Sequence, residues 1–173
     1  NDTQAPVMTN LSPSDDRRTN SNTVYFSLSG QDNYKIKEFI LEYKAEAAET
    51  YQQAAVIAAP AYLAAGAVQT AYYTWDTTGL EGRYQLRAKA IDYGGNESAY
   101  LSGSLVFDKT PPAKPVNVQA EVISGGIKVS WSAVTDSDLQ NYRVYRKAPG
   151  ESQFTYYAYI PKNSVTYSDY DII

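Results

Sequence analysis

The side chains of this chain that could carry out chemistry are carboxylates, tyrosines and lysines, because its 173 residues include no cysteine and no histidine. Thiol nucleophiles, histidine bases, disulfides and the usual ligand sets of structural zinc are therefore excluded. Two carboxylates can hydrolyse a glycoside only inside a cleft, at separations of roughly 5–10 Å, and nothing in the sequence predicts a cleft. The chain is predicted not to be an enzyme and to need no cofactor, with calcium left open.

Charge and hydropathy exclude two classes of partner. The net charge is −4 and the isoelectric point is about 4.8, whereas nucleic-acid binding needs a basic surface. The longest apolar run, Ala54–Ala67, has 14 residues, carries no charge and is interrupted by Pro60 and Gly66. A membrane-spanning helix needs about 20 apolar residues. We expect neither nucleic acid nor membrane insertion, and the start at Asn1 without a signal peptide suggests a mature or excised segment.

An internal repeat organises the chain. Shifting the sequence by 103 positions without a gap places "TVYFSLSG" (23–30) on "GIKVSWSA" (126–133) and "IKEFILEYK" (36–44) on "LQNYRVYRK" (139–147). The register continues as far as residues 51–57 on 154–160 and then breaks. "TWDTTGL" (74–80) aligns best with "YSDYDII" (167–173), which places Asp76 on Asp169 and leaves ten extra residues in the first copy.

The Ala-rich stretch thus falls into two parts. Residues 51–57 are predicted to form a strand, because they match the aromatic and β-branched "FTYYAYI". Residues 58–71 are predicted to be a surface loop, with a small apolar contact surface as the alternative. Elsewhere, "RYQLRAKAID" (83–92) alternates with the period of a half-buried strand. "KTPPAKP" (109–115) is a stiff, Pro-rich connection. Strand spacing of about ten residues without amphipathic helices indicates an antiparallel β-sandwich.

These residues carry a family resemblance. "GIKVSWSAVTDSDLQNYRVYRKAPGESQF" resembles the B–C–C′ region of a fibronectin type III domain, with Trp131 as the core tryptophan. "GLEGRYQLRAKAIDYGGNES" is similar to the E–F corner and strand F of the same superfamily, with Tyr84 at the tyrosine-corner position. "VFDKTPP" resembles the joints between Ig-like modules of bacterial surface and secreted proteins. The resemblance implies two all-β, Ig-like sandwiches in tandem.

The expected boundaries are 1–109 for the first sandwich, with an expanded C′–E loop, 110–115 for the linker and 116–173 for the second sandwich. The second copy ends before the counterparts of residues 81–108, so it is expected to lack its last strands. Either the chain is a fragment of a longer array, or a strand from a partner completes the second sandwich.

A calcium site is predicted at the joint between the sandwiches. Sandwich topology is expected to gather carboxylates from both domains there, and calcium takes six to eight oxygen ligands. No "DxDxDG" loop supports the site, and aspartates in turns are commonly caps. The residues are Asp15, Asp16, Glu81, Asp108, Asp136 and Asp138.

Exposed aromatic rings are the other candidate contacts, because a ring offers an apolar face with a polar tip to a sugar. Cross-strand packing is the competing interpretation, since tyrosine favours strands. The candidate ligand contacts are Tyr72, Tyr73, Trp75, Tyr157 and Tyr159.

The sequence therefore predicts a non-catalytic spacer or adhesion module of a secreted or cell-surface bacterial protein. Its partners are expected to be neighbouring modules of a longer chain, together with a cell-surface protein or a polysaccharide. The alternative is a carbohydrate-binding accessory module of a polysaccharide-degrading enzyme.

Overall fold

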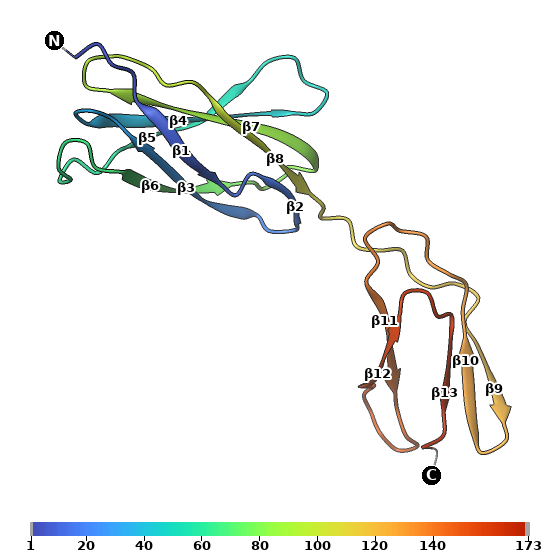
Figure 1. Ribbon diagram of the computed structural model, residues 1–173. Coiled ribbons are helices and arrows are strands. Elements are labelled where there is room, and N and C mark those ends of the chain that lie inside the picture. The colour runs from blue at the N-terminus through green and yellow to red at the C-terminus, as the bar shows by residue number, and fades with distance from the viewer. Residues whose placement is uncertain (1, 172–173) are drawn as a thin grey trace. The chain divides into compact units, whose positions relative to one another are not determined.

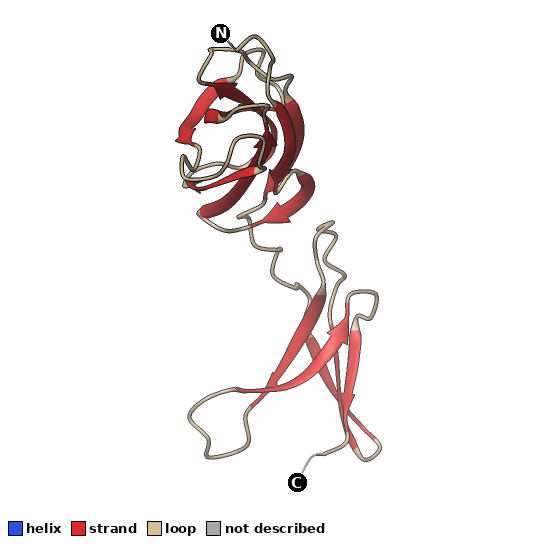
Figure 2. Cartoon of the chain, turned by 60° about the vertical axis from the view of Figure 1, so that its left-hand side comes forward, coloured by secondary structure: helices blue, strands red, loops and turns tan. Residues whose placement is uncertain are grey.

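The computed structural model describes residues 2–171 and divides the chain into two units, Asn1–Lys109 and Thr110–Ile173. Every regular element in the described residues is a β-strand (Figure 2). No helix of these residues is long and apolar enough to cross a membrane. Each unit is described by itself below. The all-β prediction is confirmed.

Unit 1 is a sandwich of two sheets (Figure 1). One sheet has the order β1-β3-β6, and the other has the order β2-β8-β7-β4-β5. This two-sheet arrangement is that of an Ig-like sandwich. The strands are β1 (Val7–Ser12), β2 (Asp15–Thr19), β3 (Thr23–Gln31), β4 (Ile36–Ala45), β5 (Gln52–Ala58), β6 (Gln69–Asp76), β7 (Gly82–Asp92) and β8 (Leu101–Phe107).

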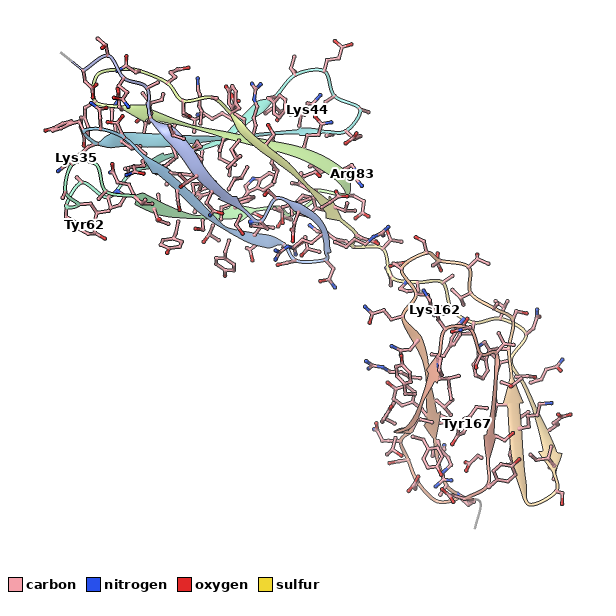
Figure 3. All side chains as sticks on the ribbon, viewed as in Figure 1. Lys35, Lys44, Tyr62, Arg83, Lys162 and Tyr167 are labelled. Atoms are coloured by element: carbon pink, nitrogen blue, oxygen red, sulfur yellow. The ribbon has the colours of Figure 1, made fainter. Side chains whose placement is uncertain are left out.

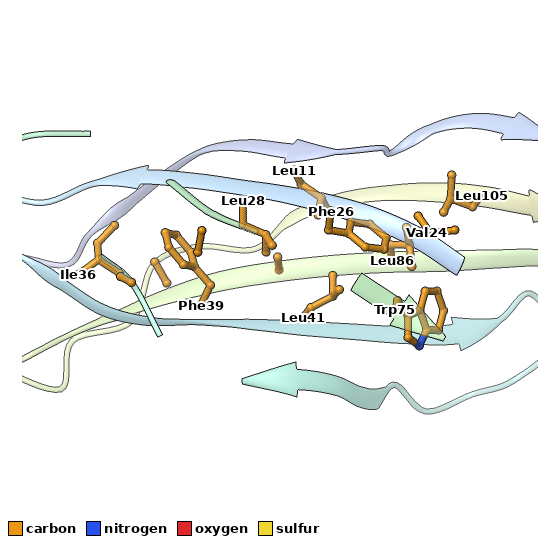
Figure 4. Close-up of a cluster of buried hydrophobic side chains, with 14 of the residues drawn as sticks. Leu11, Val24, Phe26, Leu28, Ile36, Phe39, Leu41, Trp75, Leu86 and Leu105 are labelled. Carbon is orange, nitrogen blue, oxygen red and sulfur yellow. The ribbon is translucent and has the colours of Figure 1, made fainter. Parts of the chain in front are cut away.

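Alternating side chains build the core of unit 1 (Figure 4). On β3, Val24, Phe26 and Leu28 face inward, while Tyr25 faces solvent. On β7, the predicted alternation is confirmed, since Leu86, Ala88 and Ala90 are fully buried. Burying one large aliphatic or aromatic side chain contributes roughly 1.5–3 kcal/mol, so this core is the main source of stability.

Two of the predicted calcium ligands lie in a strand. Asp15 and Asp16 begin β2, which pairs with β8 in parallel, while the other named strand pairs are antiparallel. Pro13 has no N–H to donate to a ladder, and it lies between β1 and β2, where the chain passes from one sheet to the other. The first strand of the domain is therefore split between both sheets.

Unit 2 repeats part of this arrangement. One sheet has the order β13-β10-β9, and β11 pairs with β12. Its buried cluster consists of Trp131, Leu139, Tyr142 and Ile160. The strands are β9 (Gln119–Ile123), β10 (Gly126–Ser130), β11 (Asn141–Arg146), β12 (Thr155–Pro161) and β13 (Thr166–Asp169).

The repeat extends to backbone irregularities. The β4–β5 ladder shifts register between Leu41 and Glu42, and the β11–β12 ladder shifts between Val144 and Tyr145, 103 positions later. The strand predicted over 51–57 is present as β5, Gln52–Ala58, and its counterpart β12 spans Thr155–Pro161. The offset of 103 therefore describes equivalent backbone positions in both units.

The predicted alignment of residues 74–80 with residues 167–173 is wrong by one residue. Val24 pairs with Trp75, and its equivalent Ile127 pairs with Asp169. Asp169 therefore corresponds to Trp75 and not to Asp76, an offset of 94, and the insertion has nine extra residues. The error arose because matching Asp76 to Asp169 aligned two residue types and ignored which face of the strand each one occupies.

The insertion forms a loop over residues 59–68, within the predicted range, and β6 takes the last three residues of that range. The loop packs on the β3–β4 connection: the Gly66 N–H donates to the Tyr34 carbonyl, and Lys35 Nζ donates to the Ala61 carbonyl. Tyr62 is 86% exposed and lies near Lys35 on this end of unit 1 (Figure 3).

Candidate functional site

The structure places the aspartates of the predicted joint site in unit 1 beside arginines. Each of the three carboxylates is within 2.9 Å of a guanidinium nitrogen. The Arg17 hydrogen bond lowers the pKa of Asp15, and the hydrogen bonds from Arg83 and Ser104 lower the pKa of Asp16. The pairs are Asp15 with Arg17, Asp16 with Arg83 and Asp108 with Arg18.

The other three predicted ligands have local roles as well. Glu81 Oε2 accepts a hydrogen bond from the Lys109 N–H at 3.0 Å. In unit 2, Asp136 Oδ2 accepts from the Ala113 N–H at 2.8 Å, and Asp138 lies in the turn before Leu139. Such contacts are those of ordinary caps and turns. The calcium site at the joint stays a prediction.

The predicted aromatic contacts do not form one surface. Trp75 is only 6% exposed and packs between Tyr43, Phe26 and Phe107, so the expectation that it is an exposed ring is corrected. Tyr73, the neighbouring inward residue on β6, is half-buried, and its hydroxyl donates to the Ala54 carbonyl. These two rings belong to the core.

Exposed rings do occur on the outer face of the β3–β6 pair. Tyr72 is 77% exposed and Tyr25 is 74% exposed. Ser27 pairs with Tyr72, and Tyr25 pairs with Thr74, so the two tyrosines are diagonal neighbours on one face. Diagonal side chains of this kind are within reach of each other. Sequence reasoning named Tyr72 but missed Tyr25.

In unit 2, the two predicted tyrosines face different surroundings. Tyr159 is 57% exposed on β12. Tyr157 instead belongs to a polar cluster: its hydroxyl donates to Asp171 Oδ2 at 2.6 Å, and the Arg146 guanidinium lies 4.1 Å from its ring centroid. The Asp171 hydrogen bond raises the pKa of Tyr157 to about 12. Arg146 also pairs with Asp169 at 3.0 Å.

A different group of carboxylates converges at one end of unit 1. Asp32 directly follows β3, Asp92 is the last residue of β7, and Asp2 lies in the segment before β1. One carboxylate oxygen of each lies within 4.8 Å of those of the other two. Three segments far apart in sequence therefore bring their acids together here, near the N-terminus (Figure 1). We call Asp2, Asp32 and Asp92 the acidic triad.

Hydrogen bonds hold the triad in place. Asn96 donates to Asp92 through its backbone N–H at 2.8 Å and its side-chain amide at 2.7 Å, and the same amide donates to the Asp2 carbonyl. Asn33 Nδ2 donates to Asp2 Oδ1, and the Tyr34 N–H donates to Asp32 Oδ2. The turns after β3 and β7 thus fix the carboxylates in one arrangement.

Asp32 and Asp92 are buried, Asp2 is half-buried, and the triad has no counter-cation within residues 2–171. Asp32 is 5% exposed and Asp92 is 1% exposed, and none of the three forms an ion pair with a described residue. Burial alone would raise the pKa of Asp92, yet hydrogen bonds from Asn96, Gly94 and Gly95 outweigh it and lower that pKa. Two like charges about 4.8 Å apart repel by roughly 3–4 kcal/mol at an effective dielectric constant of 20.

The sequence analysis did not combine Asp32 with Asp92. Sandwich topology, which predicted that carboxylates gather at the joint, also places the connections after β3 and after β7 at one end of the sandwich. The same argument, applied to the end opposite the joint, would have joined Asp32 with Asp92. Asp2 carried no such signal, because the residues before β1 have no periodic pattern.

The fold and these sites define an all-β protein made of tandem Ig-like sandwich modules. No protein-family model matches the chain, and no curated protein matches it. The FN1–FN3 domains of chicken CNTN1 align at 15% identity and a TM-score of 0.49, covering 95% of this chain and 57% of that chain. This chain therefore spans less than two thirds of that structure.

Two further solved structures align less well. The SrpA adhesin of Streptococcus sanguinis aligns at 11% identity and a TM-score of 0.39, covering 76% of this chain and 90% of that chain. The D00-D0 domain of Intimin aligns at 12% identity and a TM-score of 0.34, covering 94% and 83%. These values are too low to transfer a function, so the assignment of the fold rests on the strand order of this chain.

Proposed function

We propose that this chain is a non-catalytic spacer or adhesion segment of a secreted or cell-surface protein, with neighbouring modules as its partners. The observation that carries the proposal is the repeat itself: the β3–β6 and β4–β5 pairings of unit 1 recur in unit 2 as β10–β13 and β11–β12, the latter with the same register shift. Repeating one module extends a chain without adding a new active site. The absence of cysteine and histidine is consistent with this role.

The pairing of β2 with β8 supports a load-bearing role for unit 1. Strand β2 lies near the start of the unit and β8 near its end, and they run parallel with Asp15 opposite Ser104 and Thr19 opposite Phe107. Pulling the ends of two parallel strands in opposite directions loads their hydrogen bonds together, in shear. The Asp108 N–H, which donates to the Thr19 carbonyl at 2.9 Å, is one such bond.

Single-molecule pulling on the full chain tests this proposal. Ser104→Pro removes the N–H that donates to the Ser14 carbonyl, and we expect it to lower the unfolding force of unit 1. Pro in place of Ala61, in the exposed loop, is the matched control and should leave that force unchanged. Equal forces for wild type and Ser104→Pro would contradict a load-bearing pair.

The carbohydrate-binding alternative is favoured by one observation, the exposed pair Tyr25 and Tyr72 on the outer face of β3 and β6. Two neighbouring rings offer a stacking platform for a sugar. A glycan array separates the alternatives. Saturable binding that is lost in both Tyr25→Ala and Tyr72→Ala, and kept in the control Tyr62→Ala, would favour sugar recognition over a spacer.

A further inference from the structure

We infer that the acidic triad of unit 1, Asp2, Asp32 and Asp92, is a calcium-binding site that ties the segment before β1 to the ends of β3 and β7. This site is separate from the carboxylates predicted at the joint, and it does not depend on the proposed spacer function. Two observations carry the inference: the convergence of the three carboxylates within 4.8 Å, and the unsatisfied oxygens among them.

The unsatisfied oxygens indicate a missing positive partner. Asp32 Oδ1 and Asp2 Oδ2 are buried and accept no hydrogen bond in the described residues, and Asp32 as a whole is only 5% exposed. A buried, unpaired carboxylate oxygen is costly, and buried charges are normally paired or bound to a metal. Asp15, Asp16 and Asp108 each pair with an arginine, whereas no ion pair of the described residues includes a member of this triad.

The donor set selects the type of ion. Carboxylate and carbonyl oxygens are hard ligands that suit calcium or magnesium, whereas zinc and copper favour the imidazole and thiolate groups that this chain lacks. Three carboxylates offer up to six oxygens, and calcium accepts both mono- and bidentate carboxylates in flexible geometry. Magnesium prefers strict octahedral geometry and retains several waters. The triad therefore fits calcium better.

A hollow lies beside the site. It measures about 370 Å³ and is lined in part by Gln4, Asp32 and Asn33. The Gln4 N–H and Asn33 Nδ2 both donate to Asp2 Oδ1, so the hollow lies next to two members of the triad. This is the side from which an ion would approach the triad.

The backbone around Asp92 is built for a close approach. A Cβ atom added to Gly94 would lie 3.0 Å from the Asp2 carbonyl oxygen and 3.3 Å from Asp92 Oδ1. Gly95 has a φ of 87°, in the left-handed region that glycine favours. The turn "DYGGN" therefore lets the Asp2 segment lie directly against the end of β7, which is what a shared ligand requires.

Calcium titration of the full chain tests the inference by calorimetry and thermal melting. We expect saturable binding of one ion to the triad and a rise in the melting temperature of about 4 °C or more at saturation, because the ion binds the folded state. The same concentration of magnesium should give a smaller rise. Asp32→Asn and Asp2→Asn should each weaken calcium binding at least tenfold.

The variants also distinguish calcium bound at the triad from calcium bound elsewhere on the chain. In chelator, Asp32→Asn should melt at or above the temperature of wild type, because it removes one repelling charge. Asp108→Asn, an aspartate of the predicted joint, should keep the full calcium response. If Asp32→Asn fails to fold, calcium binding by Asp2→Asn decides the test, because Asp2 lies in the segment outside the strands. Absence of saturable binding, or calcium binding that survives Asp2→Asn and Asp32→Asn, would overturn the inference.

Discussion

In unit 1, the inward-facing Tyr43 and Trp75 pack with ring centroids 4.7 Å apart, whereas the equivalent residues of unit 2, Arg146 and Asp169, form an ion pair at 3.0 Å. The backbone positions correspond, because Tyr43 precedes Arg146 by 103 residues and the pairings of Trp75 and Asp169 match. The same arrangement of strands thus accommodates either an apolar contact or an ion pair at these two positions.

The two pairs differ in what surrounds them. In unit 1, Phe107 of β8 packs edge-on against Trp75, with ring centroids 5.9 Å apart, and against Tyr84 of β7 at 5.5 Å. In unit 2, Arg146 keeps 37% of its side chain exposed while it pairs with Asp169. Charges are tolerated there because water still reaches one partner.

The largest expected effect is a core truncation in unit 1. Phe39 and Tyr142 are equivalent positions, but Phe39 is fully buried and Tyr142 is 7% exposed. Phe39→Ala should destabilise unit 1 by about 3–5 kcal/mol, through lost burial and the cavity that remains. Tyr142→Ala should destabilise unit 2 by less, since its side chain lies in a smaller buried cluster.

One tryptophan in each unit makes this comparison measurable. Trp75 reports on unit 1 and Trp131 on unit 2, so urea unfolding can be followed by fluorescence in Trp131→Phe and Trp75→Phe backgrounds respectively. If Phe39→Ala and Tyr142→Ala lowered the free energy of unfolding by equal amounts, the result would contradict the smaller buried cluster of unit 2.

The second effect concerns a buried side-chain amide of unit 1. Gln69 is 1% exposed; its Oε1 accepts from the Ile36 N–H at 2.6 Å, and its Nε2 donates to the Ile36 carbonyl at 3.1 Å. Gln69→Leu leaves these backbone groups without their partner, at about 1–3 kcal/mol for an unsatisfied group. We expect unit 1 to lose about 2–3 kcal/mol in urea unfolding. Gln53→Leu, on exposed β5, is the control and should have little effect.

The third effect is acid sensitivity of the ion pair in unit 2. Burial would raise the pKa of Asp169, but hydrogen bonds from the Asp171 N–H and from Arg146 outweigh it and lower that pKa below 3.8. A carboxylate with a depressed pKa stabilises the fold above its unfolded-state pKa, and this contribution is lost as the pH falls through its folded-state pKa. The urea midpoint of unit 2 should therefore fall as the pH decreases below about 4.

Asp169→Asn isolates this contribution. The variant should have a lower urea midpoint than wild type at pH 7, because Arg146 loses its partner. Its midpoint should also change less than that of wild type between pH 5 and pH 3, as followed by Trp131 fluorescence. An unchanged acid dependence in Asp169→Asn would assign the effect to another carboxylate.

The strand pattern could be predicted from the sequence where side chains alternate clearly or where the repeat supplied a second copy. The Ala-rich β5 was found only through its counterpart in the repeat, β12, since alanine itself does not favour strands. Trp75 was misplaced because "AYYTWD" has aromatic rings on both faces. Only the polar residues, Thr74 and Asp76, show which face of the strand points to solvent. Because side chains alternate along a strand, Trp75 lies on the opposite, inward face together with Ala71.

The candidate metal site was only partly open to sequence reasoning, because sandwich topology joins Asp32 with Asp92 but does not place Asp2. Its residues come from three separate segments, and their meeting depends on how the segment before β1 lies against the turn after β7. No local pattern encodes that contact. The charge pairing of Asp16 with Arg83 was equally hidden, because the partners are 67 positions apart and meet only when β2 joins the sheet beside β8.

The smallest expected effect is the removal of the insertion that distinguishes the two units. Deleting Pro60–Val68 removes nine residues and gives Ala58 and Trp75 of unit 1 the same separation along the chain that their equivalents Pro161 and Asp169 have in unit 2. The deletion keeps the buried residues Ala59 and Gln69. It removes contacts such as the one between the Gly66 N–H and the Tyr34 carbonyl, whose polar groups water can satisfy.

We expect the deletion to change the stability of unit 1 by no more than about 1 kcal/mol, since shortening a surface loop has a small and slowly varying entropic effect. Trp75 fluorescence in urea measures it. Deleting ten residues, Ala59–Val68, is the matched comparison: it moves the junction by one position and removes a buried alanine, so it should be the more destabilising. If both deletions unfold unit 1, the loop is part of the core, and the equivalence of the two units ends at β5.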